Sequence, residues 1–265
     1  LSDVTDHSDS TGVRFTANNL TATTYYRVIV KNGACSNDTG SAMAITVNEV
    51  SLAGTISGTN AVCNGTGTTL TLANSRGSIQ WQSSANGSTW SAITGATSAT
   101  YTAPSLSSSM YYRARVKSGV CDSLFSNSVL VTVSPASVGG TVSGSATVCT
   151  GVNSTQFTLS GNTGTIQWQS STDSTNWGNI LLNGTSGTYT ATDLSTTTWY
   201  RARVTSGVCS VVTSSVGKVT VSPATVAGTA SGDTTVCASG NTVTMRLTGS
   251  VGSIQWQSSA DGGRS

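Results

Sequence analysis

The chain has 265 residues, of which only 8% are charged, and its formal net charge is +2. Average globular proteins carry about 25% charged residues, and Ser, Thr, Gly and Asn fill the difference here. So mild a charge argues against a nucleic-acid partner and against disorder driven by self-repulsion. No apolar run approaches the roughly 18 residues of a membrane span. The chain does not begin with Met, so we expect a processed form or an internal piece.

A repeat sets the domain organisation. GSIQWQSS begins at Gly77, GTIQWQSS at Gly164 and GSIQWQSS again at Gly252, so that Trp81, Trp168 and Trp256 lie 87 and 88 residues apart. So long a period indicates small domains in tandem rather than a solenoid of short motifs. The predicted divisions are 1–49, the C-terminal part of a module; 50–135 and 136–223, two whole modules; and 224–265, the N-terminal part of another.

The module 50–135 reads as short strands separated by turns. In chain order, strands are expected at 53–57, 68–73, 78–83, 89–93, 99–103, 111–117 and 128–133. Asn86-Gly87 is a strong hairpin signal. In 111–117, Tyr112, Ala114 and Val116 should point inward. The predicted fold class is therefore all-β, with tandem Ig-like antiparallel β-sandwich modules of about 87 residues, joined at Pro135 and Pro223.

The order of these motifs resembles a known kind of repeat. It runs TVC-x-G, IQWQSS, a YRARV-x-SGVC segment and SV-x-VTVSP, and it resembles the Ig-like repeats of large surface proteins of Bacteroidota, which are similar to PKD and fibronectin type III repeats. The resemblance implies an extracellular or cell-surface location and export by type IX secretion. Members of this kind include adhesins, gliding-motility filaments and spacers of secreted enzymes.

Six cysteines are spaced regularly, and His7 is the only histidine. No CxxC motif occurs, so zinc and thioredoxin-like sites have little support, and an oxidising compartment is indicated. Two pairings remain open. Because each whole module holds two cysteines, we expect Cys63–Cys121 and Cys149–Cys209, each bond stabilising by about 4 kcal/mol, with Cys35 and Cys237 paired to absent or intermolecular partners. The alternative joins Cys63 to Cys209 across a module joint.

Nothing in the sequence resembles a catalytic or cofactor site. His7 has no positioned partner, the acidic residues are scattered, and no Gly-rich phosphate loop follows a strand. Asp3, Asp6 and Asp9 lack the Gly and distal Glu of an EF-hand loop, so a solvated loop is expected rather than a calcium site. We therefore predict no enzyme activity, no cofactor and no metal.

The polar face of the sheet is the candidate ligand face, suited to a polysaccharide or to a partner's carboxylates. It comprises Gln80, Gln82, Arg113, Arg115, Gln167, Gln169, Arg201 and Arg203. The simpler interpretation is a solvated face whose Arg stems pack across the strands. Trp90 and Trp177 are either sugar-stacking platforms or, more simply, packing residues. Asp-Ser/Thr patterns, which resemble O-glycosylation sites of this phylum, mark Ser10, Ser123, Ser174 and Thr234.

The two partial modules complement each other. They indicate either a window on a longer chain or head-to-tail polymerisation, in which one chain completes the broken module of the next. We predict a stalk or filament segment of a cell-surface adhesin. The alternatives are a glycan- or protein-binding module and a spacer of a secreted hydrolase. The expected partners are neighbouring modules of the same or identical chains, and surface glycans or other surface proteins.

Overall fold

The computed structural model describes residues 14–260, and these form strands, turns and loops without a helix. The chain divides into two compact units, Leu1–Val133 and Ser134–Ser265. Each unit contains one β-sandwich of two sheets and further paired strands outside it.

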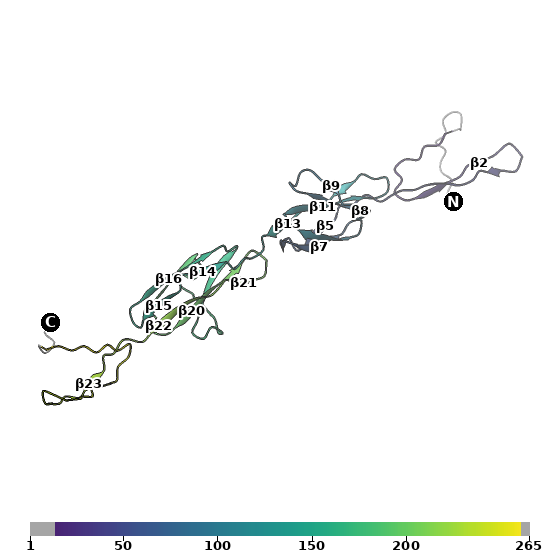
Figure 1. The fold of residues 1–265 in the computed structure, drawn as a ribbon. Helices are drawn as coiled ribbons and strands as arrows, with labels where there is room; N and C mark the ends of the chain where they lie inside the picture. Colours follow the sequence, from purple (N-terminus) through teal and green to yellow (C-terminus); the bar gives the residue numbers. More distant parts are fainter. Residues whose placement is uncertain (1–13, 261–265) are drawn as a thin grey trace. The chain divides into compact units, whose positions relative to one another are not determined.

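The module of the first unit is a sandwich of two sheets, which can be followed in Figure 1. One sheet has the strand order β10-β7-β5, and the other has the order β6-β13-β11-β8-β9, with β12 paired to β11. Their bounds are β5 Thr55–Gly58, β6 Ala61–Cys63, β7 Thr66–Ala73, β8 Ser78–Ser84, β9 Ser91–Ala92, β10 Thr100–Leu106, β11 Met110–Lys117, β12 Leu124–Phe125 and β13 Val129–Ser134.

Period-2 alternation explains which side chains fill this sandwich. In β7 the side chains of Leu70 and Leu72 are buried, and in β11 those of Tyr112, Ala114 and Val116 are buried, while the residues between them face outward. Trp81 of β8 is fully buried among them. Its indole N–H donates to the carbonyl of Ser98 at 2.8 Å, so the buried polar atom is satisfied.

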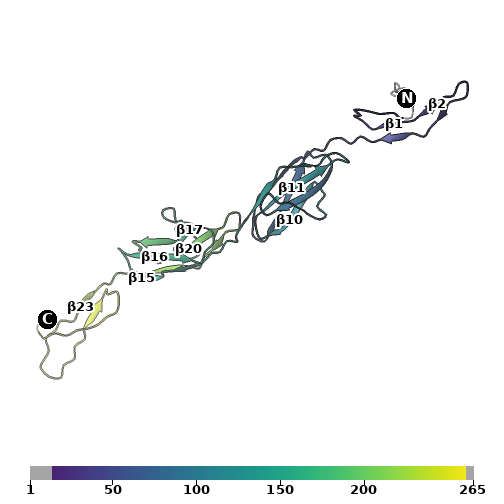
Figure 2. The same ribbon diagram turned by 90° about the horizontal axis from the view of Figure 1, so that it is seen from above.

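The second unit repeats this sandwich with β14 Thr141–Ser143, β15 Ala146–Cys149, β16 Ser154–Ser160, β17 Thr165–Ser171, β18 Gly178–Asn179, β19 Thr188–Thr192, β20 Thr198–Thr205, β21 Val212–Thr213 and β22 Gly217–Ser222. Figure 2 shows β15, β16, β17 and β20 from above. The sheets have the orders β14-β16-β19 and β15-β22-β20-β17-β18, with β21 paired to β20. Trp168 is fully buried and donates to the carbonyl of Ser186 at 2.8 Å.

The partial modules contain only paired fragments. In residues 14–49, β1 (Thr24–Tyr26) pairs with β4 (Met43–Ile45), and β2 (Ile29–Val30) pairs with β3 (Asp38–Thr39). After the second module, β23 (Thr229–Ser231) pairs with β24 (Arg246–Thr248). Trp256 keeps the position of the two buried tryptophans in the repeat, yet 47% of its surface is exposed. Apolar side chains of this last segment, Ile254 and Trp256 among them, are thus exposed.

The predicted fold class, tandem Ig-like β-sandwiches, is confirmed, with two refinements. The short strands β6 and β12 were not expected. In addition, β15 and β22 run parallel, so the second module is not purely antiparallel. The expected division into modules at 49, 135 and 223 remains a prediction.

Candidate functional site: the Gln and Arg face

The strand register brings the predicted Gln and Arg residues directly opposite one another. In the first module Gln82 faces Arg113 and Gln80 faces Arg115. In the second module Gln169 faces Arg201 and Gln167 faces Arg203. The same four-residue arrangement therefore occurs in both modules. Whether it could bind a ligand depends on which of its side chains are already engaged within the module.

Gln80 and Gln167 are occupied by the backbone of their own modules. The amide of Gln80 donates to the carbonyls of Trp81 at 3.0 Å and Ile93 at 2.7 Å. Gln167 makes the same two bonds to Trp168 and Ile180, at 2.9 and 2.8 Å. These amides hold the loop that follows β9 or β18 against the sheet, and their donors are not open to a ligand.

Arg113 is held on three sides. Its Nε donates to Gln82 Oε1 at 2.8 Å, and its guanidinium carbon lies 4.2 Å from the ring centre of Trp90 and 4.0 Å from that of Phe125. Burial lowers the pKa of Arg113, although a guanidinium stays charged at neutral pH. Each such cation–π contact is worth about 0.5–1 kcal/mol at a partly exposed site. Phe125 was missed by the sequence analysis, because the two-residue strand β12 carries no periodic signal.

The second module repeats this arrangement without the second aromatic ring. Arg201 Nε donates to Gln169 Oε1 at 2.9 Å, and its guanidinium carbon lies 4.2 Å from the Trp177 ring centre. Gln169 is buried and also donates to Asn179 Oδ1 at 2.9 Å. The pKa of Arg201 is lowered by burial and secondarily by Arg203. Trp90 and Trp177 are half-buried packing partners of arginine, so the face of each ring that the guanidinium covers is closed to a sugar.

The residues that remain open on this face are Arg115 and Arg203. Arg115 is exposed and Arg203 is half-buried. Among the described residues, they are the arginines of the predicted ligand face that do not lie over an aromatic ring.

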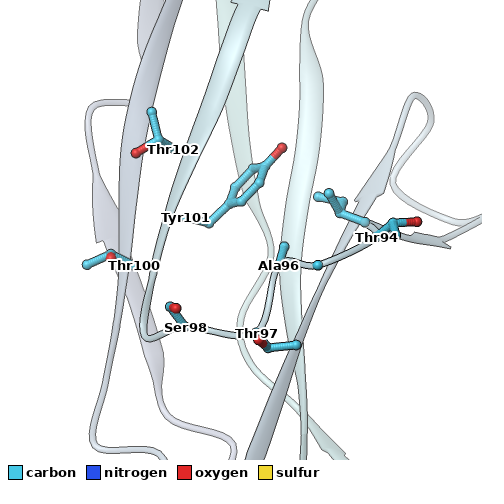
Figure 3. A pocket seen from close by; sticks show the side chains of 9 residues that line it. Thr94, Ala96, Thr97, Ser98, Thr100, Tyr101 and Thr102 are labelled. Atoms are coloured by element: carbon cyan, nitrogen blue, oxygen red, sulfur yellow. The ribbon is translucent and has the colours of Figure 1, made fainter.

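A shallow depression of about 250 Å³ lies beside the first module's sheet, lined by residues 93–98 and 100–102. Figure 3 shows Tyr101 between the strand residues Thr100 and Thr102 and the loop residues Ala96 and Thr97. The corresponding loop of the second module is one residue longer and exposes Leu181 and Leu182. The loop that lines the depression therefore differs between the two modules.

The cysteines differ from the favoured expectation. Cys63 and Cys209 are disulfide-bonded, whereas Cys35, Cys121, Cys149 and Cys237 carry free thiols. The expected pairs Cys63–Cys121 and Cys149–Cys209 are consequently not formed, since one member of each pair is a free thiol. The physical reason is that the two cysteines of the second module lie at opposite ends of it. Cys149 pairs in register with Ser222, where the chain leaves the sandwich, whereas Cys209 Sγ lies 3.2 Å from the carbonyl oxygen of Pro135, where the chain enters it.

Three of the four predicted glycosylation sites can be placed. Ser174 is exposed in the turn after β17 with φ +60, Thr234 is exposed, and Ser123 is half-buried. The fourth, Ser10, lies outside the described residues, as do His7, Asp3, Asp6 and Asp9. Within residues 14–260, no group of three or more His, Cys, Asp or Glu is placed to hold a metal ion.

The chain belongs to a family described as "Domain of unknown function (DUF8696)", whose profile matches residues 2–49, 52–135, 138–223 and 226–265. A search of curated proteins found no relative.

Among solved structures, 267 chains match. One is a marsupial T cell receptor, 16% identical, covering 68% of this chain and 77% of the other with a TM-score of 0.47. Another contains titin domains A168–A170, 13% identical, covering 76% and 75% with a TM-score of 0.41.

Tandem Ig-like repeats of this kind suggest a structural or spacer module. The disulfide and the Ig-like fold fit an extracellular domain. Among residues 14–260 there is no helix of the length and apolarity needed to cross a membrane.

Proposed function

We propose that the chain is a stalk or filament segment of an extracellular bacterial adhesin, whose Ig-like modules hold a distant functional part away from the cell. The supporting observation is that the repeated side chains are engaged inside each module. Trp81 and Trp168 are fully buried, and the guanidinium groups of Arg113 and Arg201 stack on tryptophan. The residues that recur in both modules are therefore ones that stabilise the fold, and not ones that could carry out a reaction.

The finer part of this proposal rests on the sequence resemblance. The quoted motifs resemble repeats of large Bacteroidota surface proteins exported by type IX secretion, which favours a cell-surface location. Ser and Thr in place of charged residues are common on the surfaces of secreted β proteins. The partners we propose are neighbouring modules of the same kind, with surface glycans or surface proteins as targets of the part that the stalk carries.

A glycan-binding function is the second candidate, and one observation favours it. Arg115, which is exposed, and Arg203, which is half-buried, recur at matching positions of the two modules, where they would recognise the carboxylates of an acidic polysaccharide. On the stalk proposal these cations serve solubility.

The test uses the whole 265-residue chain on an array that includes acidic glycans at physiological salt. The stalk proposal predicts no glycan bound above the level of the R115S/R203S double variant. A matched control, K31S/R246S, removes the same amount of charge at exposed positions outside the two sandwiches. A glycan that binds the unmodified chain and the control but not R115S/R203S would overturn the proposal in favour of the binding module.

A further inference from the structure

We infer that the turn after β11, and its counterpart after β20, clamps the segment through which the chain enters each module and closes that segment to proteases. The clamp turn is residues 118–121 in the first module and 206–209 in the second, both of sequence Ser-Gly-Val-Cys. The entry segments are residues 48–51 and 134–137. Each clamp turn and its entry segment lie in the same compact unit, so the contacts between them are internal to that unit. The clamp would act in the same way whether or not the chain is a stalk.

The two clamp turns have the same backbone shape. Gly119 and Gly207 have φ of +52 and +51, a left-handed conformation that other residues adopt only with strain. In each turn the N–H of the cysteine donates to the carbonyl of the serine three residues before it, at 2.9 Å. The N–H of that serine is directed instead to the entry segment.

A serine of the entry segment binds the clamp turn in both modules. Ser51 Oγ accepts from the N–H of Ser118 at 2.9 Å and donates to the carbonyl of Asp122 at 2.7 Å. Ser137 holds the same position of the repeat and accepts from the N–H of Ser206 at 2.9 Å. Ser51 is 5% exposed. Because a buried polar group that loses its partner is costly, these hydrogen bonds oppose release of the segment.

The residue three positions before the bound serine packs against the glycine of the turn. Asn48 Oδ1 accepts from the N–H of Val120 at 3.3 Å. A Cβ at Gly119 would collide with the Asn48 side chain, and a Cβ at Gly207 would collide with the hydroxyl of Ser134, which holds the position of Asn48. Glycine is therefore needed here both for the shape of the turn and for the close approach of the entry segment.

Further contacts fix Glu49 in the first module. Cys121 Sγ lies 3.5 Å from the Glu49 carbonyl oxygen, and Arg76 Nε lies 2.9 Å from Glu49 Oε2. Directly after the entry segment, Leu52 exchanges two backbone hydrogen bonds with Arg76, at 3.0 and 3.1 Å. The backbone on both sides of Glu49 is thus held, and a protease can cut there only when the segment opens, at a rate that follows the population of the open form.

Glu49 is the only glutamate of the chain, so a glutamate-specific protease tests the first clamp at a single bond. Mass spectrometry identifies the products, residues 1–49 and 50–265. We expect the folded chain to be cut far more slowly than a synthetic peptide of residues 44–54. S51A and G119A should each raise the cutting rate of the folded chain about tenfold, because each removes a hydrogen bond that closes the segment. A folded chain cut as fast as the peptide would overturn the proposal.

Two matched variants control for loss of a hydroxyl and for strain at glycine. S57A removes an exposed hydroxyl of β5, and G95A adds a Cβ at a glycine of positive φ that has nothing within 4 Å. Both should leave the rate within about twofold of that of the unmodified chain, because neither substitution touches the entry segment. The proposal fails if these controls accelerate cutting as much as S51A and G119A do, or if S51A and G119A leave the rate unchanged.

Hydrogen exchange separates opening of the segment from unfolding of the module. The amide of Ser118 should exchange faster in S51A, and that of Val120 faster in G119A, while the amides of β8 and β11 stay protected. Equal loss of protection in β8 and β11 would show that the segment opens only with the whole module, and would contradict a local clamp.

The second module offers an independent arm. Ala136 is exposed in the second entry segment, so A136E places a cleavage site there. Adding S137A removes the hydroxyl that binds Ser206, and should speed cutting after position 136 about tenfold relative to A136E alone. Equal rates for A136E and A136E/S137A would contradict the clamp in this module.

Discussion

At the scale of single residues, the repeated polar and aromatic groups serve the fold. The alternation in β11 predicted its buried side correctly, because apolar and polar residues alternate along a strand that has one face buried and the other exposed. The engagement of Arg113 by Trp90 and Phe125 could not be predicted, since those residues come from three separate segments of the chain. The alternation of apolar and polar residues predicted which face of the sheet each side chain lies on, but it did not predict which other side chains it contacts.

The buried tryptophan should dominate module stability. W168A removes a fully buried indole and its hydrogen bond to Ser186, and we expect it to cost about 3–5 kcal/mol. The control W177A removes a half-buried ring and one cation–π contact, and should cost about 1 kcal/mol. Urea unfolding, with hydrogen exchange of the β17 and β20 amides, measures both. Equal costs would contradict the assignment of Trp168 to the core and Trp177 to the surface.

Asp173 should make the turn after β17 sensitive to acid. Its carboxylate accepts hydrogen bonds from the Asn176 side chain at 2.6 Å, from the backbone N–H groups of Asn176 and Thr175 at 2.7 and 2.9 Å, and from the hydroxyl of Ser171 at 2.8 Å. These bonds, that of the Asn176 side chain first, hold the pKa of Asp173 well below its usual range. A depressed folded pKa stabilises the module above the unfolded pKa of about 3.9, and this stabilisation is lost as pH falls through the folded value.

Thermal unfolding at several pH values tests this. D173N should unfold at a lower temperature than the unmodified chain at pH 7, and the difference should shrink as the pH falls below about 4. In the first module Asn86 Oδ1 accepts from Ser88 and Thr89, so N86A provides a control whose cost should not change over that range. A D173N difference that stayed constant down to pH 2 would contradict the prediction.

At the scale of elements, strands with five or more alternating residues were predictable, and of the shorter strands of the first module β5 and β9 were expected but β6 and β12 were not. β6 and β12 contain three and two residues, too few for a period to show. The parallel pairing of β15 with β22 depends on a strand crossing between sheets, which local pattern does not encode.

The turn that begins β17 depends on glycine. Gly164 has φ +127, and a Cβ there would lie 2.6 Å from the carbonyl carbon and oxygen of Thr205. We expect G164A to cost about 2–4 kcal/mol, because neither backbone segment can move aside. G161A is the control: Gly161 also has positive φ, but nothing lies within 4 Å of its added Cβ, so about 1 kcal/mol is expected. Denaturant unfolding that found both substitutions equally mild would show that β17 and β20 do not approach this closely.

At the scale of the whole molecule, the repeat was evident from sequence but the cysteine pairing was not. Because each whole module contains two cysteines, the sequence favoured disulfide bonds within modules. Their positions at opposite module ends follow from which strands carry them, and only the register of β15 with β22 made that visible. We propose that the chain acts by mechanical continuity, through tandem modules that each fold around a core of their own.

Pulling single molecules from both ends tests this claim most directly. Because each whole module has a buried core of its own, the two should unfold in reducing buffer as two separate force steps. W168A, which removes a buried side chain from the second core, should lower the force of one step and leave the other unchanged. A chain that extended without separate steps, or a W168A variant in which both steps weakened, would contradict the account.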